Sequence, residues 1–356
     1  MNPVALALCG CGWVVRQAYA PVLRPMADRF DVAVVFDPDP AALEVAERLW
    51  PRARRVTSFE ALLDERFDAA LVAGPNASHL DQTVRLLRNG RACLVEKPVL
   101  RDEADLAALA AAAFVGGSHL VAATACRHRA DVRFWLDQCR QIAPLRRIDL
   151  LWHRHDGIPA RAWQRRSDDG WTGVVPDLGT HLLDIAGAAL DWPEGSIRRT
   201  ALRAEVDTAE SAAALAVGAA RWHGAETAVP MLATPSRCAL GLTVSGIEVT
   251  ISVRWRDETA GDLVRLSAVG DNGSAVLEGL FGFSDARRVP WQRVERHAPD
   301  APMMVRDFQP GVALQRAGFA AVLRDFAARL QQPPSPDSPI SADLAFLARA
   351  GTALRA

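Results

Sequence analysis

The chain opens with a short apolar run that stops at two closely spaced glycines, and this feature narrows the choice of fold more than any other. Residues 4–8 are apolar, Gly10-Cys11-Gly12 follows directly, and a helical pattern runs over residues 14–27. A buried parallel strand that leads through a tight glycine turn into a helix produces this pattern. The N-terminus therefore predicts the first unit of a doubly wound α/β sheet.

The same alternation of apolar runs and helical patterns continues as far as residue 123. Further runs that are short, apolar and bounded by turn residues are typical of buried strands, and they lie at residues 32–36, 69–73, 92–95 and 120–123. Helical patterns lie between them, at residues 41–49, 59–63, 79–89 and 102–113. We therefore expect residues 1–123 to form one α/β domain with a doubly wound parallel sheet.

A different pattern begins after residue 123 and becomes rich in strands from about residue 200. Apolar and polar residues alternate over residues 247–255, which is typical of a half-buried antiparallel strand. Gly270-Asp271-Asn272-Gly273 is a strong signal for a hairpin turn. We expect residues 124–356 to form an α+β domain with an open, mainly antiparallel sheet and a last helix that can pack back on the first domain.

Charge, cysteine spacing and hydropathy exclude several classes of protein. The formal net charge is −1, so neither nucleic acid nor an anionic membrane is an expected partner. The six cysteines show no spacing typical of a metal site, and we expect reduced structural thiols and no bound metal. The longest apolar stretch, residues 106–115, is too short to cross a bilayer. These features predict a cytoplasmic protein.

The glycine turn is suited to a dinucleotide. Gly10 and Gly12 let the backbone approach a pyrophosphate, which then lies at the start of a helix containing Trp13 and Val14. Asp37 ends the second strand, where a carboxylate accepts hydrogen bonds from the adenosine ribose and repels a 2′-phosphate. No arginine directly follows it, so the pattern favours NAD over NADP. Alternatively, Asp37 only caps a turn.

Two more motifs follow the third and fourth strands, at the sheet edge where open α/β sheets bind ligands. Pro75, Asn76 and His79 belong to a loop that would flank the cofactor. Asn76 is equally suited to capping a helix, and His79 to a structural role at the start of that helix. Glu96 and Lys97 follow the fourth strand and are expected at the reactive end of the bound nucleotide.

Lys97 is the only lysine in a chain with 41 lysines and arginines. An arginine keeps its proton, whereas a lysine is a compact donor that can share one. A single lysine at the end of a parallel strand therefore points to proton chemistry at that position. The alternative is chance survival of one lysine in an arginine-rich composition.

Asp177 and His181 stand four residues apart in a helical pattern, so they share one helix face. An imidazole beside a carboxylate is a suitable proton acceptor at neutral pH. The alternative is an ordinary contact on the surface of a helix.

In this order and spacing, the glycine loop, the Pro-Asn-x-x-His loop, the Glu-Lys-Pro motif and the Asp-x-Gly-x-His motif resemble the GFO/IDH/MocA family of oxidoreductases. The resemblance covers most of the chain. It implies a Rossmann domain that binds NAD and reversible oxidation of a secondary ring hydroxyl. The substrate would be a sugar, an amino sugar, an aminoglycoside intermediate or a cyclitol. The resemblance also implies a homodimer or homotetramer built through the C-terminal sheet, and a cis peptide between Lys97 and Pro98.

The resemblance further implies a role for each residue of the site. Lys97 would hydrogen-bond the reacting hydroxyl oxygen, His181 would accept its proton, and Asp177 would orient the pair. Arg127 stands where many family members place an arginine near the substrate, although an ion pair explains it equally well.

Two tryptophans complete the expected substrate site, Trp163 and Trp171. Trp171 stands where many family members have a glycine, and its ring either stacks on a sugar or packs against a neighbouring subunit. A structural role for Trp163 is as well supported as a substrate contact. Two other functions remain open: an NAD-dependent glycoside hydrolase that oxidises the ring transiently, and a dinucleotide sensor without catalysis.

Overall fold

The computed structural model describes residues 2–155, 172–205, 235–257, 259, 261–284, 286–334 and 340–355, and the chain divides into two compact units. The first unit contains Met1–Ala125 and Arg316–Ala348, and the second contains Cys126–Gln315 and Arg349–Ala356. The sequence places the boundary at residue 123 and assigns residues 316–348 to the second domain. In the structure these residues belong to the first unit.

The first unit is built on a parallel sheet with the strand order β3-β2-β1-β4-β5-β6. Its strands are β1 (Val4–Cys9), β2 (Phe30–Phe36), β3 (Arg54–Val56), β4 (Ala69–Val72), β5 (Ala92–Glu96) and β6 (Leu120–Ala123). The strand order reverses between β1 and β4, and such sheets bind ligands beyond the carboxyl ends of their strands at this point. The predicted doubly wound sheet is confirmed.

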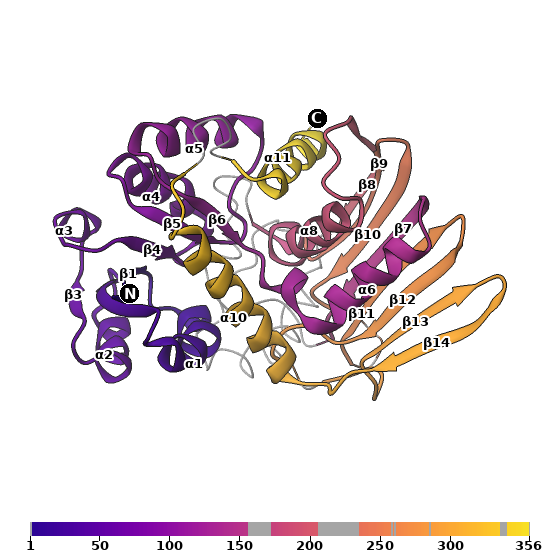
Figure 1. Cartoon of the computed structure of the whole chain (residues 1–356), viewed down its shortest axis with the longest axis horizontal. Coiled ribbons are helices and arrows are strands. Elements are labelled where there is room, and N and C mark those ends of the chain that lie inside the picture. Colours follow the sequence, from indigo (N-terminus) through magenta and orange to yellow (C-terminus); the bar gives the residue numbers. More distant parts are fainter. Residues whose placement is uncertain are drawn as a thin grey trace. The chain divides into compact units, whose positions relative to one another are not determined.

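Helices cover both faces of this sheet, with α4 and α5 on one side and α1 and α2 on the other (Figure 1). They are the π-helical η1 (Val15–Tyr19), α1 (Ala20–Leu23), the 3-10 helix η2 (Arg24–Met26), α2 (Pro40–Leu49), α3 (Phe59–Leu63), α4 (Asn76–Arg88) and α5 (Glu103–Gly116). The predicted single helix over residues 14–27 is thus three short segments of different winding. No helix in the described ranges combines the length and apolarity needed to cross a membrane.

Helix α10 (Val312–Arg329) packs into the first unit through aromatic rings. The ring of Phe319 meets the edge of Tyr19 at a centroid distance of 4.9 Å. The ring of Phe326 stacks on Phe30 at 6.4 Å. Both phenylalanines are buried, and burying a large aromatic side chain is among the strongest local stabilising contributions. These contacts explain why residues late in the chain return to the N-terminal unit.

The second unit is built on a mixed sheet with the strand order β14-β13-β12-β11-β7-β10-β9-β8. Its strands are β7 (Leu145–His153), β8 (Ile197–Glu205), β9 (Arg237–Val244), β10 (Ile247–Arg254), β11 (Leu263–Gly270), β12 (Gly273–Gly279), β13 (Arg293–Ala298) and β14 (Ala301–Asp307). Strands β7 and β10 run parallel, and the other neighbouring pairs run antiparallel. Asp271 and Asn272 form the predicted hairpin turn between β11 and β12. The predicted, mainly antiparallel sheet is confirmed.

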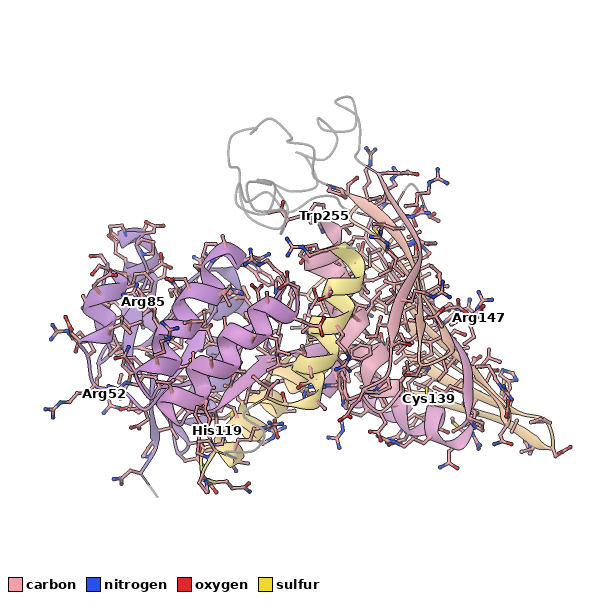
Figure 2. The ribbon with its side chains drawn as sticks, turned by 90° about the horizontal axis from the view of Figure 1, so that it is seen from above. Arg52, Arg85, His119, Cys139, Arg147 and Trp255 are labelled. Carbon is pink, nitrogen blue, oxygen red and sulfur yellow. The ribbon has the colours of Figure 1, made fainter. Side chains whose placement is uncertain are left out.

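Helices lie along one face of this sheet (Figure 1). They are α6 (Ala130–Gln141) and α8 (Thr180–Ala189), and the unit also includes residues of the 3-10 helix η3 (Ala125–His128), the π-helical η4 (Val175–Gly179) and the end of α11 (Ala342–Arg355). Cys139 of α6 is buried on the helix-covered side, whereas Arg147 of β7 points from the opposite face with 53% of its side chain exposed (Figure 2). The alternating burial along β10 and β11 follows from this one-sided covering.

Candidate active site

The glycine loop of the first unit is fixed by contacts that only glycine permits. Gly10 has a φ of +100°, and a Cβ atom there would lie 2.9 Å from the carbonyl oxygen of Ala73. The backbone N–H of Cys11 donates a 2.8 Å hydrogen bond to Oδ2 of Asp37. The loop is therefore held between the ends of β2 and β4, with Gly12, Trp13 and Val14 half-buried beyond it.

Asp37 has two backbone partners. Its Oδ2 atom accepts the hydrogen bond from Cys11, and its Oδ1 atom accepts a 3.0 Å hydrogen bond from the N–H of Asp39. The second contact is the turn cap that the sequence leaves open as an alternative. The first contact, which the sequence does not predict, connects the carboxylate expected near the adenosine ribose to the loop expected near the pyrophosphate.

His79 connects two loops at the carboxyl ends of β4 and β5. Helix α4 begins at Asn76 after Pro75, and its buried His79 ring has Nδ1 3.0 Å from the Pro98 oxygen and Nε2 3.0 Å from the Gly74 oxygen. Burial lowers the pKa of His79. This geometry gives His79 the structural role that the sequence leaves open as an alternative.

Glu96 and Lys97 follow β5, and the Lys97–Pro98 peptide is cis, as the family resemblance implies. Glu96 is buried, with 7% of its surface exposed. Its Oε1 atom accepts a 2.7 Å hydrogen bond from the hydroxyl of Tyr19, and its Oε2 atom lies 3.2 Å from the backbone N–H of Lys97. Burial raises the pKa of Glu96, while the hydrogen bond from Tyr19 and the charge of Lys97 act in the opposite direction.

Tyr19 is not among the residues predicted from the sequence. It is the only tyrosine in the chain and is fully buried at the end of η1, directly after the glycine loop. Its scarcity was a signal of the same kind as the single lysine. The partner, 77 residues away in sequence, follows from the fold and not from a local pattern.

Asp177 lies on η4 of the second unit and is held by two strand ends. Trp255, directly after β10, donates its indole N–H to Oδ2 of Asp177 at 2.7 Å. Nη1 of Arg154, directly after β7, lies 3.3 Å from the same oxygen. The carboxylate of Asp177 therefore accepts hydrogen bonds from a charged and a neutral donor.

His181 lies beside an aromatic side chain. The rings of His181 and Trp152 have centroids 5.6 Å apart, and the Trp152 ring meets Phe281 edge to face at 5.6 Å. The guanidinium carbon of Arg154 lies 5.5 Å from the centroid of Trp152. A chain of contacts within the second unit thus connects Asp177 to His181, from Asp177 to Arg154, from Arg154 to Trp152 and from Trp152 to His181.

The other residues of the predicted substrate site differ in what the structure shows. Arg127 of η3 forms an ion pair with the buried Asp184 at 3.4 Å, and its guanidinium lies 4.7 Å from the centroid of Trp192. These partners are those of the ion-pair alternative. Trp163 and Trp171 lie outside the described residues.

The candidate site residues of the first unit, Glu96 and Lys97, differ in chemistry from those of the second unit, Asp177 and His181. In the first unit a buried carboxyl group adjoins a lysine at the strand ends of a dinucleotide-type sheet, and the second unit holds a carboxylate and an imidazole whose neighbours, Arg154 and Trp152, contact each other. A lysine is a hydrogen-bond donor and an imidazole is a proton acceptor, and these are the two kinds of group that the oxidation of an alcohol needs. Within the described part of the chain, no three or more His, Cys, Asp or Glu side chains gather as a metal site.

Comparison with known proteins identifies the family. Residues 4–120 match the GFO/IDH/MocA oxidoreductase family, described as having an NAD-binding Rossmann fold. A protein of Amycolatopsis mediterranei (strain S699), named as the oxidoreductase subunit of a UDP-kanosamine synthase, is 30% identical over 328 residues. The match covers 90% of this chain and 89% of that protein. The chain belongs to the GFO/IDH/MocA family of oxidoreductases, and its first unit is a Rossmann domain for a nicotinamide dinucleotide.

Solved structures share the fold over the whole chain. A variant of KijD10, a 3-ketoreductase from Actinomadura kijaniata solved with TDP-benzene and NADP, aligns with a TM-score of 0.76 and 17% identity, covering 99% of this chain and 97% of that one. GenD2 from gentamicin A biosynthesis, solved with NAD, aligns with a TM-score of 0.71 and 18% identity, covering 99% and 95%. At these identities the two structures establish the fold alone.

Proposed function

We propose that this protein is an NAD-preferring dehydrogenase that reversibly oxidises a secondary ring hydroxyl of a sugar or amino sugar. Aminoglycoside intermediates and cyclitols belong to the same chemical class of substrate. Within this class we favour a hexose carried on a nucleoside diphosphate, because the relative at 30% identity is named for a UDP-linked amino sugar. The solved KijD10 variant, which holds a TDP compound, supports the same choice.

In this proposal Lys97 and His181 act on one hydroxyl group. The Lys97 ammonium donates a hydrogen bond to the hydroxyl oxygen, His181 takes the hydroxyl proton, and Asp177 orients the pair. When bound, the dinucleotide supplies the acceptor for the hydride that leaves the carbon. The alcohol loses one proton and one hydride and becomes a ketone, and the reverse steps reduce the ketone.

Asp37 supports the preference for NAD. Its carboxylate lies at the end of β2 and accepts a hydrogen bond from Cys11 of the glycine loop. A negative charge at this place opposes a 2′-phosphate, whereas the two ribose hydroxyls of NAD can donate to it. Trp13, Val14, Pro75 and Asn76 complete the proposed cofactor contacts.

The observation that carries the proposal is the position of Lys97. It follows β5 at the carboxyl edge of the parallel sheet, and the loop that contains it is held by the contacts of Glu96 with Tyr19 and of Pro98 with His79. A lysine that only kept the protein soluble would not need a buried, hydrogen-bonded loop. A loop fixed in this way supports catalysis because an active group must be held in one geometry.

The test is to assay the protein against a panel of alcohols, once with NAD and once with NADP. UDP- and TDP-hexoses, free hexoses, amino sugars, aminoglycoside intermediates and cyclitols are offered in turn, and formation of reduced nicotinamide is followed by absorbance. Net reduction with one of these alcohols supports the proposal. Sugar release without net reduction would indicate a glycoside hydrolase, and cofactor binding without any turnover would indicate a sensor.

We also propose a homodimer or homotetramer formed through the sheet of the second unit, in the cytoplasm. The face of this sheet that carries Arg147 is available for such an interface, and the six cysteines are buried free thiols, which suits a reducing compartment. Light scattering of the purified protein, repeated with Arg147→Glu, tests the assembly, and an unchanged mass in the variant argues against this face.

A further inference from the structure

The only tyrosine of the chain lies between the glycine loop and the Glu-Lys-Pro loop. Tyr19 ends the π-helical segment after the glycine loop and is fully buried. The ring of Phe319 packs against it at 4.9 Å, with the planes at 78°. A buried tyrosine hydroxyl needs a hydrogen-bond partner, and here the partner is the Glu96 carboxyl group at 2.7 Å.

Glu96 uses one carboxyl oxygen for each of two loops. Oε1 accepts from the Tyr19 hydroxyl and Oε2 faces the backbone N–H of Lys97 at 3.2 Å. The charged or titratable groups that face Glu96 are Tyr19, the Lys97 ammonium and, through the backbone of Glu96, the ring of His79. The carboxyl group is therefore the link between the helix after the glycine loop and the lysine at the end of β5.

We propose that Tyr19 is a positioning residue for the reaction: its hydroxyl holds Glu96, and through Glu96 it holds Lys97 in register with the cofactor-binding loop. The proposal rests on the proposed function, because it needs Lys97 to act on the substrate hydroxyl. A carboxylate stabilised by a donor is also the natural counter-ion for the neighbouring ammonium. Losing the donor leaves a buried carboxyl group that protonates more easily and no longer fixes the loop.

The main test is Tyr19→Phe, which removes the hydroxyl and keeps the ring. We expect kcat to fall about tenfold while KM for the dinucleotide changes less than about twofold, since the lost interaction acts on Lys97 and not on the pyrophosphate. The Tyr19 hydrogen bond lowers the pKa of Glu96, so its loss raises that pKa further. The acid limb of the kcat profile should therefore move to higher pH.

Two further variants separate positioning from packing. Glu96→Gln keeps an acceptor for Tyr19 and removes the titrating carboxyl group, so Tyr19→Phe should no longer move the acid limb when it is made in the Glu96→Gln background. Adding Tyr19→Phe to Glu96→Gln should then have less effect on kcat than Tyr19→Phe has alone. Phe319→Leu loosens the packing around the Tyr19 ring without removing the hydroxyl, and it should leave the acid limb in place.

An NMR measurement that needs no turnover can test the role of Tyr19 separately from the proposed dehydrogenase activity. With ¹³Cζ-labelled tyrosine, the full-length protein gives one resonance, because the chain has one tyrosine. We expect this resonance to shift in Glu96→Gln and again when NAD saturates the wild-type protein. If no sugar is oxidised but both shifts occur, the dehydrogenase assignment fails and the link between the two loops stands.

The opposite results would overturn the positioning role. These are a Tyr19→Phe variant with the kcat and pH profile of the wild type, or a tyrosine resonance that is unmoved by both Glu96→Gln and NAD. If Tyr19→Phe fails to fold, Glu96→Gln and the resonance of the wild-type protein decide the question alone.

Discussion

The indole N–H of Trp255 lies 2.7 Å from Oδ2 of Asp177, so the end of a sheet strand fixes a side chain of the proposed proton-transfer group. Strands β7 and β10 pair in parallel, with His153 opposite Arg254. Their carboxyl ends therefore meet at one edge, and the next residues, Arg154 and Trp255, both reach Asp177. A sheet that is otherwise antiparallel thus uses its parallel pair to hold the carboxylate from two sides.

Trp255→Phe should lower kcat about tenfold with a smaller change in KM. Trp255 is 1% exposed, and phenylalanine keeps most of its apolar contact while the N–H donor to a carboxylate is lost. Asp177 would then lose one of its donors and would orient its partners less well. Steady-state kinetics with the substrate found in the panel assay measures the effect.

Trp291→Phe is the matched control for this variant. Its indole N–H also donates to a carboxylate, at 3.0 Å to Glu278, but the side chain is 38% exposed. We expect its kinetic constants to stay within about twofold of the wild type. Equal losses of kcat in both variants would mean that removing any tryptophan N–H perturbs the second unit. Such a result would argue against a specific role for Trp255.

Lys97→Arg should reduce kcat at least about a hundredfold, because an arginine cannot share a proton and its planar head has a different shape. The affinity for NAD should change by less than about threefold, since the pyrophosphate and ribose contacts are made elsewhere. Cofactor affinity is measured by fluorescence titration and turnover by absorbance. A variant that keeps most of its turnover would show that position 97 needs only a positive charge.

Local patterns predicted the parts of this protein that local chemistry decides. The glycine loop, the buried strands and the hairpin at Asp271-Asn272 follow from short-range sterics and periodicity, so the sequence located them. Strand β3 was missed because it has three residues, two of them exposed arginines, and shows no alternation. The strand exists because β2 offers it a hydrogen-bonding edge, which no local pattern reveals.

The contacts of the candidate site depend on register across the sheet and could not be predicted. Asp177 meets Trp255 across 78 residues, and Tyr19 meets Glu96 across 77. The sequence proposed Asp177 and His181 as one pair on a helix face. It could not identify Arg154 as the neighbour of Asp177 or Trp152 as the neighbour of His181, because these residues are placed by β7 and its partner strands.

Asp37→Asn should narrow the preference for NAD over NADP by at least about tenfold in kcat/KM, because the negative charge that opposes the 2′-phosphate is removed. An amide retains one acceptor oxygen, so it can keep the hydrogen bond from either Cys11 or Asp39. Asp39→Asn is the control, since that carboxylate accepts from Ala41 at the start of α2. If the ratio of kcat/KM for NAD to kcat/KM for NADP is unchanged in Asp37→Asn, the charge of Asp37 does not determine the cofactor preference.

The stability of the second unit should fall as the pH drops from about 6.5 to about 4, partly through His153. Burial, followed by the charge of Arg254, lowers the pKa of His153 from 6.5 to about 4. Between these values the unfolded chain binds a proton that the folded protein does not, so folding is disfavoured as the pH falls. Its ring nitrogens lie 3.1 Å from Asp257 and 2.8 Å from Ser252.

His153→Gln isolates this contribution, because glutamine can hydrogen-bond and does not titrate. Urea unfolding at several pH values should give a shallower loss of stability on acidification than in the wild-type protein. Parallel curves for the two proteins would mean that His153 binds its proton equally well in the folded and the unfolded state.

Arg129→Met should destabilise the second unit by about 3–5 kcal/mol, since it leaves the buried Asp131 carboxylate without its cation. Arg129 is 1% exposed, and its Nε and Nη2 atoms lie 3.1 and 2.8 Å from the two oxygens of Asp131. It also donates to the side chain of Gln315 and the carbonyl oxygen of Leu280. These hydrogen bonds connect the residue before α6 to the residue after β12 and to α10, and methionine can form none of them.

Arg293→Met is the control for burial, because Arg293 makes the same two-point contact with Asp307 at 2.6 and 3.0 Å on the surface. The two side chains are 34% and 59% exposed, so water screens the pair, and its loss should cost no more than about 1 kcal/mol. Urea midpoints measured for both variants give the comparison. We expect the loss of unfolding free energy to be several-fold larger in Arg129→Met than in Arg293→Met, because only the buried carboxylate has no water to replace the guanidinium. Equal losses in the two variants would show that the buried network of Arg129 adds nothing beyond an ordinary ion pair.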